Sequence, residues 1–238
     1  MGEVFTPALT VQSMLDLLPP AIWTSHPSPT FLEPSCGDGN FLNAILERKL
    51  NKVAEEFANG ILRSGKEVAA AQFHALEALA SIYAVDISIE NVIGGTPGHE
   101  IGARTRLLTA FIEWNAVALA KRLVDRSLIL RAAEWIVDHN IIVGNMLPVD
   151  ATGKPTGRNE LPLIDYTFEP LTQTVILMKT TMGDVIAAED AKTSYVLQLF
   201  GPVAPKLLWK GKALNLAEAE RINAPELQSP ARNGTRRV

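Results

Sequence analysis

Short apolar runs alternate with longer helical segments through the first 145 residues of the chain. Three runs rich in apolar residues predict buried strands, at 30–32, 81–85 and 139–143. Apolar residues at helical spacing, or alanine-rich stretches without Gly or Pro, predict helices at 8–19, 41–46, 66–80, 103–122 and 127–136. Strands that are apolar throughout are typical of a parallel sheet that is covered on both faces. We therefore expect an α/β fold with a mostly parallel sheet and helices on both faces.

The pattern changes after residue 145. Two further strands are predicted there, at 174–179 and 195–200. From 223 to 238 the chain is rich in Pro, Gly, Asn and Arg and poor in apolar residues, which predicts a flexible basic tail. We therefore expect one domain over residues 1–222, followed by this tail over 223–238.

Composition narrows the classes of protein to which the chain can belong. The formal net charge is -4 and the pI about 5.6, so contact with DNA would depend on local patches or on a partner. The single cysteine, Cys36, excludes a disulfide framework or a cysteine-based zinc site, and the four histidines are scattered without ligand spacing, so no metal site is predicted. No apolar stretch approaches the roughly 20 residues of a membrane span, and the N-terminus lacks the pattern of a secretory signal. We expect a cytoplasmic protein.

The turn after the first predicted strand carries the strongest chemical signal. Gly37 and Gly39 allow the backbone to turn tightly and to approach a ligand closely, while the amides that open the next helix face it. Glu33 and Asp38 beside this turn disfavour a phosphate and favour a cationic ligand. S-adenosylmethionine (SAM), with its sulfonium and its α-ammonium group, is such a ligand. Asp86, at the end of the second strand, is in position to accept hydrogen bonds from both ribose hydroxyls.

Three segments together resemble the N6-adenine DNA methyltransferases of restriction–modification systems. EPSCGDGNFL at 33–42 is similar to the cofactor motif of that family, GEVFTP at 2–7 to its Phe-Thr-Pro segment, and YAVDI at 83–87 to its second strand. The resemblance implies a Rossmann-like SAM-dependent methyltransferase fold, with SAM as cofactor and DNA as substrate. It implies that the cofactor is contacted by Phe5, Thr6, Pro7, Glu33, Pro34, Gly37, Asp38, Gly39, Phe41 and Asp86.

The base-binding tetrad of this family is an Asp or Asn, two prolines and an aromatic residue, and no such sequence occurs in the chain. Two segments are candidates to replace it. The first is the strand that ends at Gly144-Asn145, where Met and Leu stand in the place of the prolines. That segment also resembles the preceding family motif, near the adenine of the cofactor. On this second interpretation, which we favour, Asp165 and Tyr166 take the place of the tetrad. The candidate catalytic residues are therefore Asn145, Asp165 and Tyr166.

Three functions remain open from the sequence. The chain is a SAM-dependent adenine-N6 DNA methyltransferase with an altered tetrad, or a catalytically degenerate homologue that binds SAM or DNA as a partner subunit. The third and weaker hypothesis is a methyltransferase with another substrate, such as a protein side chain or a small molecule. Little chain follows the core to read a base sequence, which favours a separate DNA-recognition subunit. Arg232, Arg236 and Arg237 of the tail are suited to phosphate contacts at most.

Overall fold

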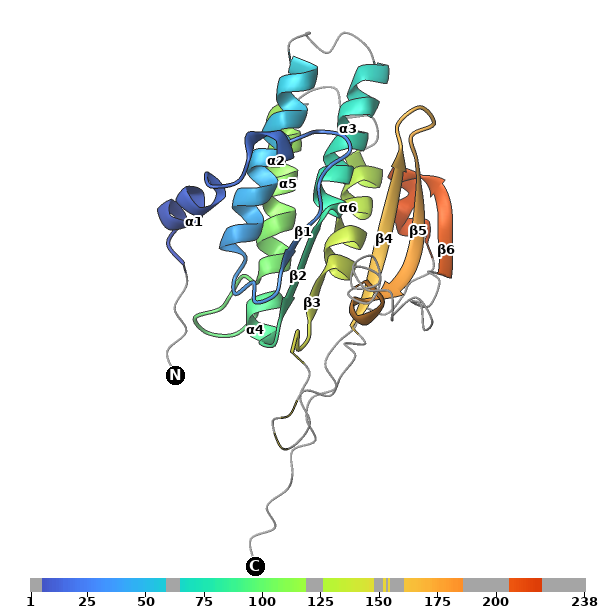
Figure 1. Ribbon diagram of the computed structural model, residues 1–238. Coiled ribbons are helices and arrows are strands. Elements are labelled where there is room, and N and C mark those ends of the chain that lie inside the picture. The colour runs from blue at the N-terminus through green and yellow to red at the C-terminus, as the bar shows by residue number, and fades with distance from the viewer. Residues whose placement is uncertain are drawn as a thin grey trace, which may run out of the picture.

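The computed structural model describes residues 6–58, 65–118, 126–147, 152, 154, 161–185 and 206–219. Within them the chain forms a mixed α/β structure with two separate three-stranded sheets (Figure 1). The α-helices are α1 (Ala8–Leu15), α2 (Asn40–Ala58), α3 (Gly65–Ala80), α4 (Ile89–Val92), α5 (Ala103–Ala118) and α6 (Arg126–Asn140). The strands are β1 (Phe31–Glu33), β2 (Ile82–Asp86), β3 (Ile141–Val143), β4 (Pro162–Glu169), β5 (Thr174–Thr181) and β6 (Lys206–Lys212), and the 3-10 helices are η1 (Pro20–Ile22) and η3 (Ala213–Glu218).

The first sheet is parallel, with β2 between β1 and β3. Phe31 pairs with Ile82, so β1 and β2 begin at the same level, and Asp86 pairs with Val143, so β2 and β3 end at the same level. β2 and β3 are almost wholly buried, because their apolar side chains meet helices rather than water. The predicted parallel sheet is confirmed, although it is short.

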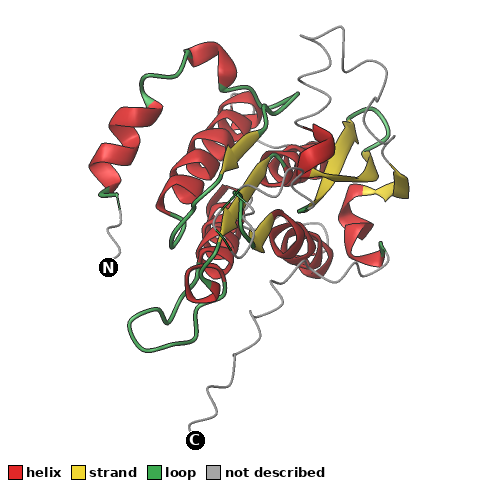
Figure 2. Cartoon of the chain, turned by 60° about the horizontal axis from the view of Figure 1, so that its bottom comes forward, coloured by secondary structure: helices red, strands yellow, loops and turns green. Residues whose placement is uncertain are grey.

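Helices flank this sheet on two sides. α2 and α5 lie on one side of the strands, and α3 and α6 lie on the other (Figure 2). α3 ends one residue before β2, and α6 ends immediately before β3, so each of these helices leads directly into a strand. The helices extend beyond the amino ends of the short strands and pack against one another there.

The second sheet is antiparallel, in the order β4-β5-β6, and was not predicted. Its strands alternate between buried and exposed side chains, which is the pattern of a sheet with one wet face. The buried face packs on α6 and η3 through Ile164, Phe168, Val175 and Leu177. The sequence predicted β5, whereas it treated the residues of β4 as a catalytic segment and gave no signal for β6.

Two tyrosines link the two sheets. The Tyr83 hydroxyl of β2 donates a hydrogen bond to the carbonyl of Ile164 in β4, at 2.6 Å. The Tyr166 hydroxyl of β4 donates to Oδ1 of Asn140, at 2.8 Å, and the Asn140 amide donates in turn to the carbonyl of Ile82 in β2, at 3.2 Å. Burial raises the pKa of both tyrosines above the usual value, so they remain protonated donors.

The third predicted strand begins two residues too early. His139 and Asn140 belong to the last turn of α6, and β3 begins at Ile141. The ring of His139 stacks on Trp135 at 3.9 Å between centroids, and its Nδ1 lies 2.7 Å from the Trp135 carbonyl. These contacts across one helical turn hold the segment in the helix. The predicted strand at 195–200 and the predicted tail at 223–238 lie outside the described residues.

Candidate cofactor site

The turn after β1 is fastened to β2 by its backbone. The Cys36 amide donates to the Val85 carbonyl at 3.1 Å, and the Gly39 amide donates to the Cys36 carbonyl at 3.0 Å. Gly37 and Gly39 have φ values of +52° and +94°, in the left-handed region that favours glycine. A Cβ on Gly39 would also lie 3.1 Å from the Cβ of Ala103, the first residue of α5. Gly39 is therefore required both for its φ and for the packing of the turn against α5.

Asp86 at the end of β2 holds this turn in place. One of its carboxylate oxygens accepts the Gly37 amide at 2.8 Å. The other accepts the Ser88 amide at 2.9 Å and the Asn91 side-chain amide at 3.3 Å. The side chain is 5% exposed, so these bonds satisfy a charge that would be costly to bury alone. Asp86 thus has a structural role in addition to the ribose contact that the sequence predicts.

The segment before α1 reaches the same turn. The Thr6 carbonyl accepts a hydrogen bond from the side-chain amide of Asn40, the first residue of α2, at 3.2 Å. Pro7 precedes α1, and its carbonyl accepts the Val11 amide of the first helical turn. Thr6 therefore lies beside the start of α2, which follows the glycine turn directly. Phe5 lies outside the described residues.

Asp38 lines a small pocket of about 160 Å³. Its carboxylate forms an ion pair with Arg106 of α5 at 3.0 Å, and the loop 98–101 closes the other side. The sequence gave no signal for Arg106, because the residue lies far from the turn along the chain. The ion pair offsets part of the negative charge that the sequence assigned to this end of the sheet.

The remaining predicted cofactor residues lie along the start of the turn. Glu33 ends β1 half-buried, Pro34 is exposed, and Phe41 packs half-buried against the core from α2. Burial raises the pKa of Glu33, and the nearby Asp86 carboxylate adds to the rise, whereas a bond from the Ser35 amide opposes it. Burial likewise raises the pKa of the Cys36 thiol, so it remains a neutral filler and not a nucleophile.

The charges of these groups favour a cationic ligand. Glu33, Asp38 and Asp86 place three carboxylates around one glycine turn, and the Asp86 carboxylate adds to the rise that burial causes in the pKa of Glu33. Turn amides and helix starts at the carboxyl end of a parallel sheet are the usual place for a nucleotide-like ligand.

The candidate catalytic residues are divided between the two ends of the sheet. Gly144 donates its amide to the Asp86 carbonyl at 2.8 Å, so Asn145 follows β3 beside the end of β2. The Asn145 side chain accepts the Leu147 amide at 3.0 Å and shapes the segment after the strand. Asp165 and Tyr166 lie in β4, on a cavity whose other wall includes Thr30. Thr30 precedes β1, so this cavity is at the amino end.

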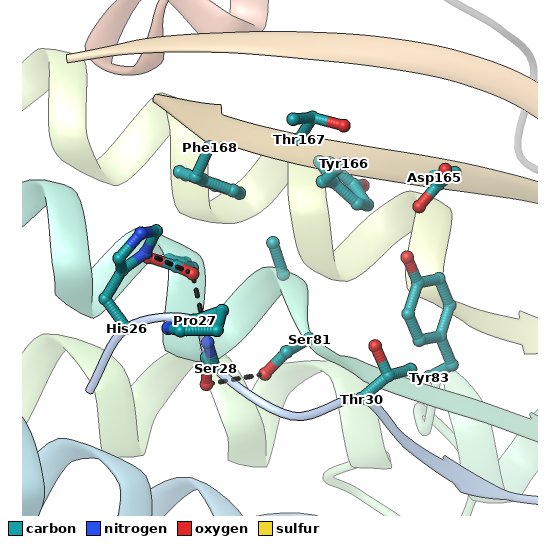
Figure 3. Close-up of a pocket in the computed structure, with 12 residues that line it drawn as sticks. His26, Pro27, Ser28, Thr30, Ser81, Tyr83, Asp165, Tyr166, Thr167 and Phe168 are labelled. Carbon is teal, nitrogen blue, oxygen red and sulfur yellow. Dashed lines mark hydrogen bonds and ion pairs between the residues drawn. The ribbon is translucent and has the colours of Figure 1, made fainter. Parts of the chain in front are cut away.

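That cavity has a volume of about 220 Å³ and was not predicted (Figure 3). In Figure 3, His26 and Ser28 lie toward one end of it, and Tyr83 and Asp165 lie toward the other. Glu77 of α3 also lines it. Its residues come from the loop 23–30, from the end of α3 and from β4, so no local sequence pattern could have revealed it.

A buried lysine anchors the loop 23–30 at this end of the sheet. The Lys49 ammonium of α2 donates to the Ser28 hydroxyl and to the Pro29 carbonyl, and lies 4.8 Å from the centre of the Phe31 ring. Lys49 is 1% exposed, and burial lowers its pKa to about 7, against the opposing attraction of Glu77.

Comparisons with models of known families, with curated proteins and with solved structures found no match. Among the described residues, no helix is both long and apolar enough to span a membrane.

Proposed function

We propose that this chain is the SAM-binding core of an adenine-N6 DNA methyltransferase. The observation that carries the proposal is the convergence of three separate segments at the carboxyl end of the parallel sheet. Asn40 joins the Thr6 carbonyl to the glycine turn, and Asp86 joins that turn to β2. The same three segments resemble the methyltransferase family in sequence, although they are distant from one another along the chain.

The arrangement suits a ligand with the charges of SAM. When bound, SAM supplies an electrophilic methyl group. Glu33 and Asp38 bind its cationic groups, Asp86 accepts hydrogen bonds from its ribose, and the segment after Gly144 borders its adenine. The donation of the Gly37 amide to Asp86 fixes the orientation of that carboxylate before any ligand arrives.

We further propose that the parallel sheet is one half of a Rossmann-like sheet. In doubly wound sheets the ligand lies where the strand order reverses, so the first strand has neighbours on both sides. Here β1 pairs only with β2 among the described residues, and Leu32 of β1 is 42% exposed. We expect a further strand, which leads to a base-binding segment, to pair with this edge of β1.

This edge favours the second candidate function, a SAM-binding partner subunit that does not transfer methyl groups alone. Asp165 and Tyr166 cannot serve the proposed cofactor site from β4, because β4 pairs with β5 and lines the cavity at the other end of the sheet. Of the candidate catalytic residues, only Asn145 lies at the carboxyl end. A DNA-recognition partner would then supply the residues that bind the flipped base.

Two measurements on the full chain test these proposals. Calorimetry with SAM and with its demethylated product should show binding in the micromolar range, about −8 kcal/mol. Incubation with methyl-labelled SAM and unmodified duplex DNA then separates the two candidates. Label in adenine supports a complete methyltransferase, and binding without label supports the partner subunit. Absence of binding would contradict both.

A further inference from the structure

Two histidines and a glutamate meet at the amino end of the parallel sheet. His26 comes from the loop 23–30, while His74 and Glu77 lie one turn apart on α3. His26 Nδ1 lies 2.8 Å from Glu77 Oε2, and His74 Nδ1 lies 3.5 Å from the same oxygen. All three donor atoms lie within 4.8 Å of one another. Figure 3 shows His26 at the wall of the cavity.

His74 is unusual among buried polar side chains because one of its ring nitrogens makes no hydrogen bond. The residue is 9% exposed, and its Nδ1 has no hydrogen-bond partner. Its nearest acceptor, Glu77 Oε2 at 3.5 Å, is too distant for a good hydrogen bond. Phe57 and Phe73 pack against the His74 ring, at 5.4 and 5.5 Å between centroids, and keep water from it. A buried ring nitrogen therefore lies near a carboxylate without a hydrogen bond between them.

The spacing of these atoms matches a tetrahedral metal site. Donor atoms bound to zinc at about 2.0–2.2 Å lie about 3.3–3.5 Å apart, close to the distance between His74 and Glu77. The shorter contact between His26 and Glu77 would open by about 0.5 Å, and His26 can follow because it is in a loop and its side chain is 33% exposed. Two imidazoles and one carboxylate are also the ligand set of many zinc sites that keep one position open.

We propose that His26, His74 and Glu77 bind a divalent transition-metal ion, for which zinc is the best match. The fourth coordination position faces the cavity, where Ser28 and Ser81 lie beside Glu77 and can orient a bound water. The ion would join the loop 23–30 to α3 and fix the chain that leads into β1. This proposal does not depend on the proposed cofactor site, which lies at the opposite end of the same strands.

The charge around the cluster permits a cation. Glu77 supplies one negative charge, and Asp165 supplies a second at the far end of the cavity. The cation facing the cluster is Lys49, which interacts with Glu77. The Lys49 ammonium is held by the Ser28 hydroxyl and the Pro29 carbonyl.

Titration of the chelator-treated full chain with Zn²⁺ and with Co²⁺ tests this site. We expect one equivalent to bind, and the Co²⁺ form to show the visible absorption of a four-coordinate ion. His26→Ala and His74→Ala should each weaken binding at least about 100-fold, since each removes a direct ligand. His99→Ala, which removes a histidine of the distant loop 94–102, should leave the affinity unchanged. At about 100 times its dissociation constant, Zn²⁺ should raise the melting temperature by about 5–10 °C.

Two results would overturn the proposal. One is a failure of the wild-type chain to bind an equivalent of either ion, in which case Glu77 serves only as a hydrogen-bond acceptor for His26 and the Ser28 amide. The other is unchanged affinity in His26→Ala. Because His26 is in a partly exposed loop, that variant keeps the test valid even if His74→Ala does not fold.

Discussion

The two ends of the parallel sheet are built from different kinds of residue. At the carboxyl end, three carboxylates surround a glycine turn, and backbone amides fix one of them, Asp86. At the amino end, two histidines and Glu77 line a cavity next to a buried lysine. Four steps along β2, about 13 Å, separate these ends. The first arrangement suits an organic cation, and the second suits a metal ion.

The two ends also differ in how far apart along the chain their residues lie. The carboxyl end is built from short motifs that follow strands directly, so its residues are recognisable one segment at a time. The amino end is assembled by packing, because the loop 23–30 meets α3 some 50 residues later. Substitutions at one end should therefore leave ligand binding at the other end unaffected.

The largest effect is expected for Gly39→Leu. A residue with a side chain at φ +94° costs about 1–2 kcal/mol, and crowding against Ala103 at 3.1 Å costs about 1–3 more. We expect the free energy of unfolding to fall by about 2–5 kcal/mol and SAM binding to be lost. Chemical denaturation and calorimetry measure the two effects.

Gly95→Ala is the matched control for the φ alone. Gly95 has φ +90°, yet a Cβ there would meet nothing within 4 Å. We expect it to cost only about 1–2 kcal/mol and to leave SAM binding intact. Equal losses of stability in the two variants would contradict the role of Gly39 in packing against α5.

Buried Lys49, at the amino end of the sheet, should make the free energy of unfolding depend on pH. Burial lowers the pKa of Lys49 to about 7 in the folded state, against 10.5 for a lysine in the unfolded chain. Between pH 7 and 10.5 the unfolded chain binds more protons than the folded chain, so the free energy of unfolding rises with pH. Below about pH 7 Lys49 is protonated in both states and makes no contribution to the pH dependence. We expect a rise on the order of 3 kcal/mol between pH 7 and 10.5. Urea denaturation should show this rise in the wild-type chain and not in Lys49→Met.

The wild-type chain also contains tyrosines that titrate at high pH. Burial raises the pKa of Tyr83 and Tyr166, which makes stability fall as the pH rises above the usual tyrosine value near 10. The comparison with Lys49→Met cancels this contribution because both proteins retain the tyrosines. A rise of equal size in the variant would show that Lys49 is not its source.

Asp86→Ala should affect both stability and ligand binding at the carboxyl end. The change leaves the Gly37 and Ser88 amides without their acceptor, so we expect the free energy of unfolding to fall by about 1–3 kcal/mol. If Asp86 also binds the ribose, SAM affinity should fall tenfold to a hundredfold, about 1.5–3 kcal/mol. Asp138→Ala, which removes a surface partner of Arg104, should do neither. A loss of affinity below threefold would leave Asp86 with its structural role alone.

Local pattern was sufficient for much of the fold. The helical spacing before Pro19 predicted α1, the alanine-rich stretch predicted α3, and the apolar runs predicted β1 and β2. The pattern failed where a side chain acts through a tertiary contact. Asn140 extends α6 because its side-chain amide donates to the Ala80 carbonyl, and this partner, 60 residues earlier, cannot be identified from the segment itself.

The candidate site divides in the same way. Gly37 and Gly39 were recognisable because a left-handed turn after a strand favours glycine. The contacts of Ala103 and Arg106 with this turn were not, since α5 approaches it from over 60 residues away. Asp165-Tyr166 supplied an acid and an aromatic, but the alternating burial of β4 places them in an antiparallel sheet. The pairing partners β5 and β6 decided their location.

The smallest expected effect is on SAM affinity, and it distinguishes between the two candidate base-binding segments. Asn145 follows β3 beside Asp86, and its side chain accepts the Leu147 amide. Asn145→Ala should loosen that segment and weaken SAM binding by about 0.5–1.5 kcal/mol, the value of one hydrogen bond. Asp165→Ala should leave the affinity unchanged, because Asp165 lines the cavity at the amino end. Calorimetry on the two variants provides the comparison, with stability checked by thermal unfolding. If Asp165→Ala weakened SAM binding more than Asn145→Ala did, the cofactor would lie in the cavity beside His26, and the assignment of the two ends would have to be reversed.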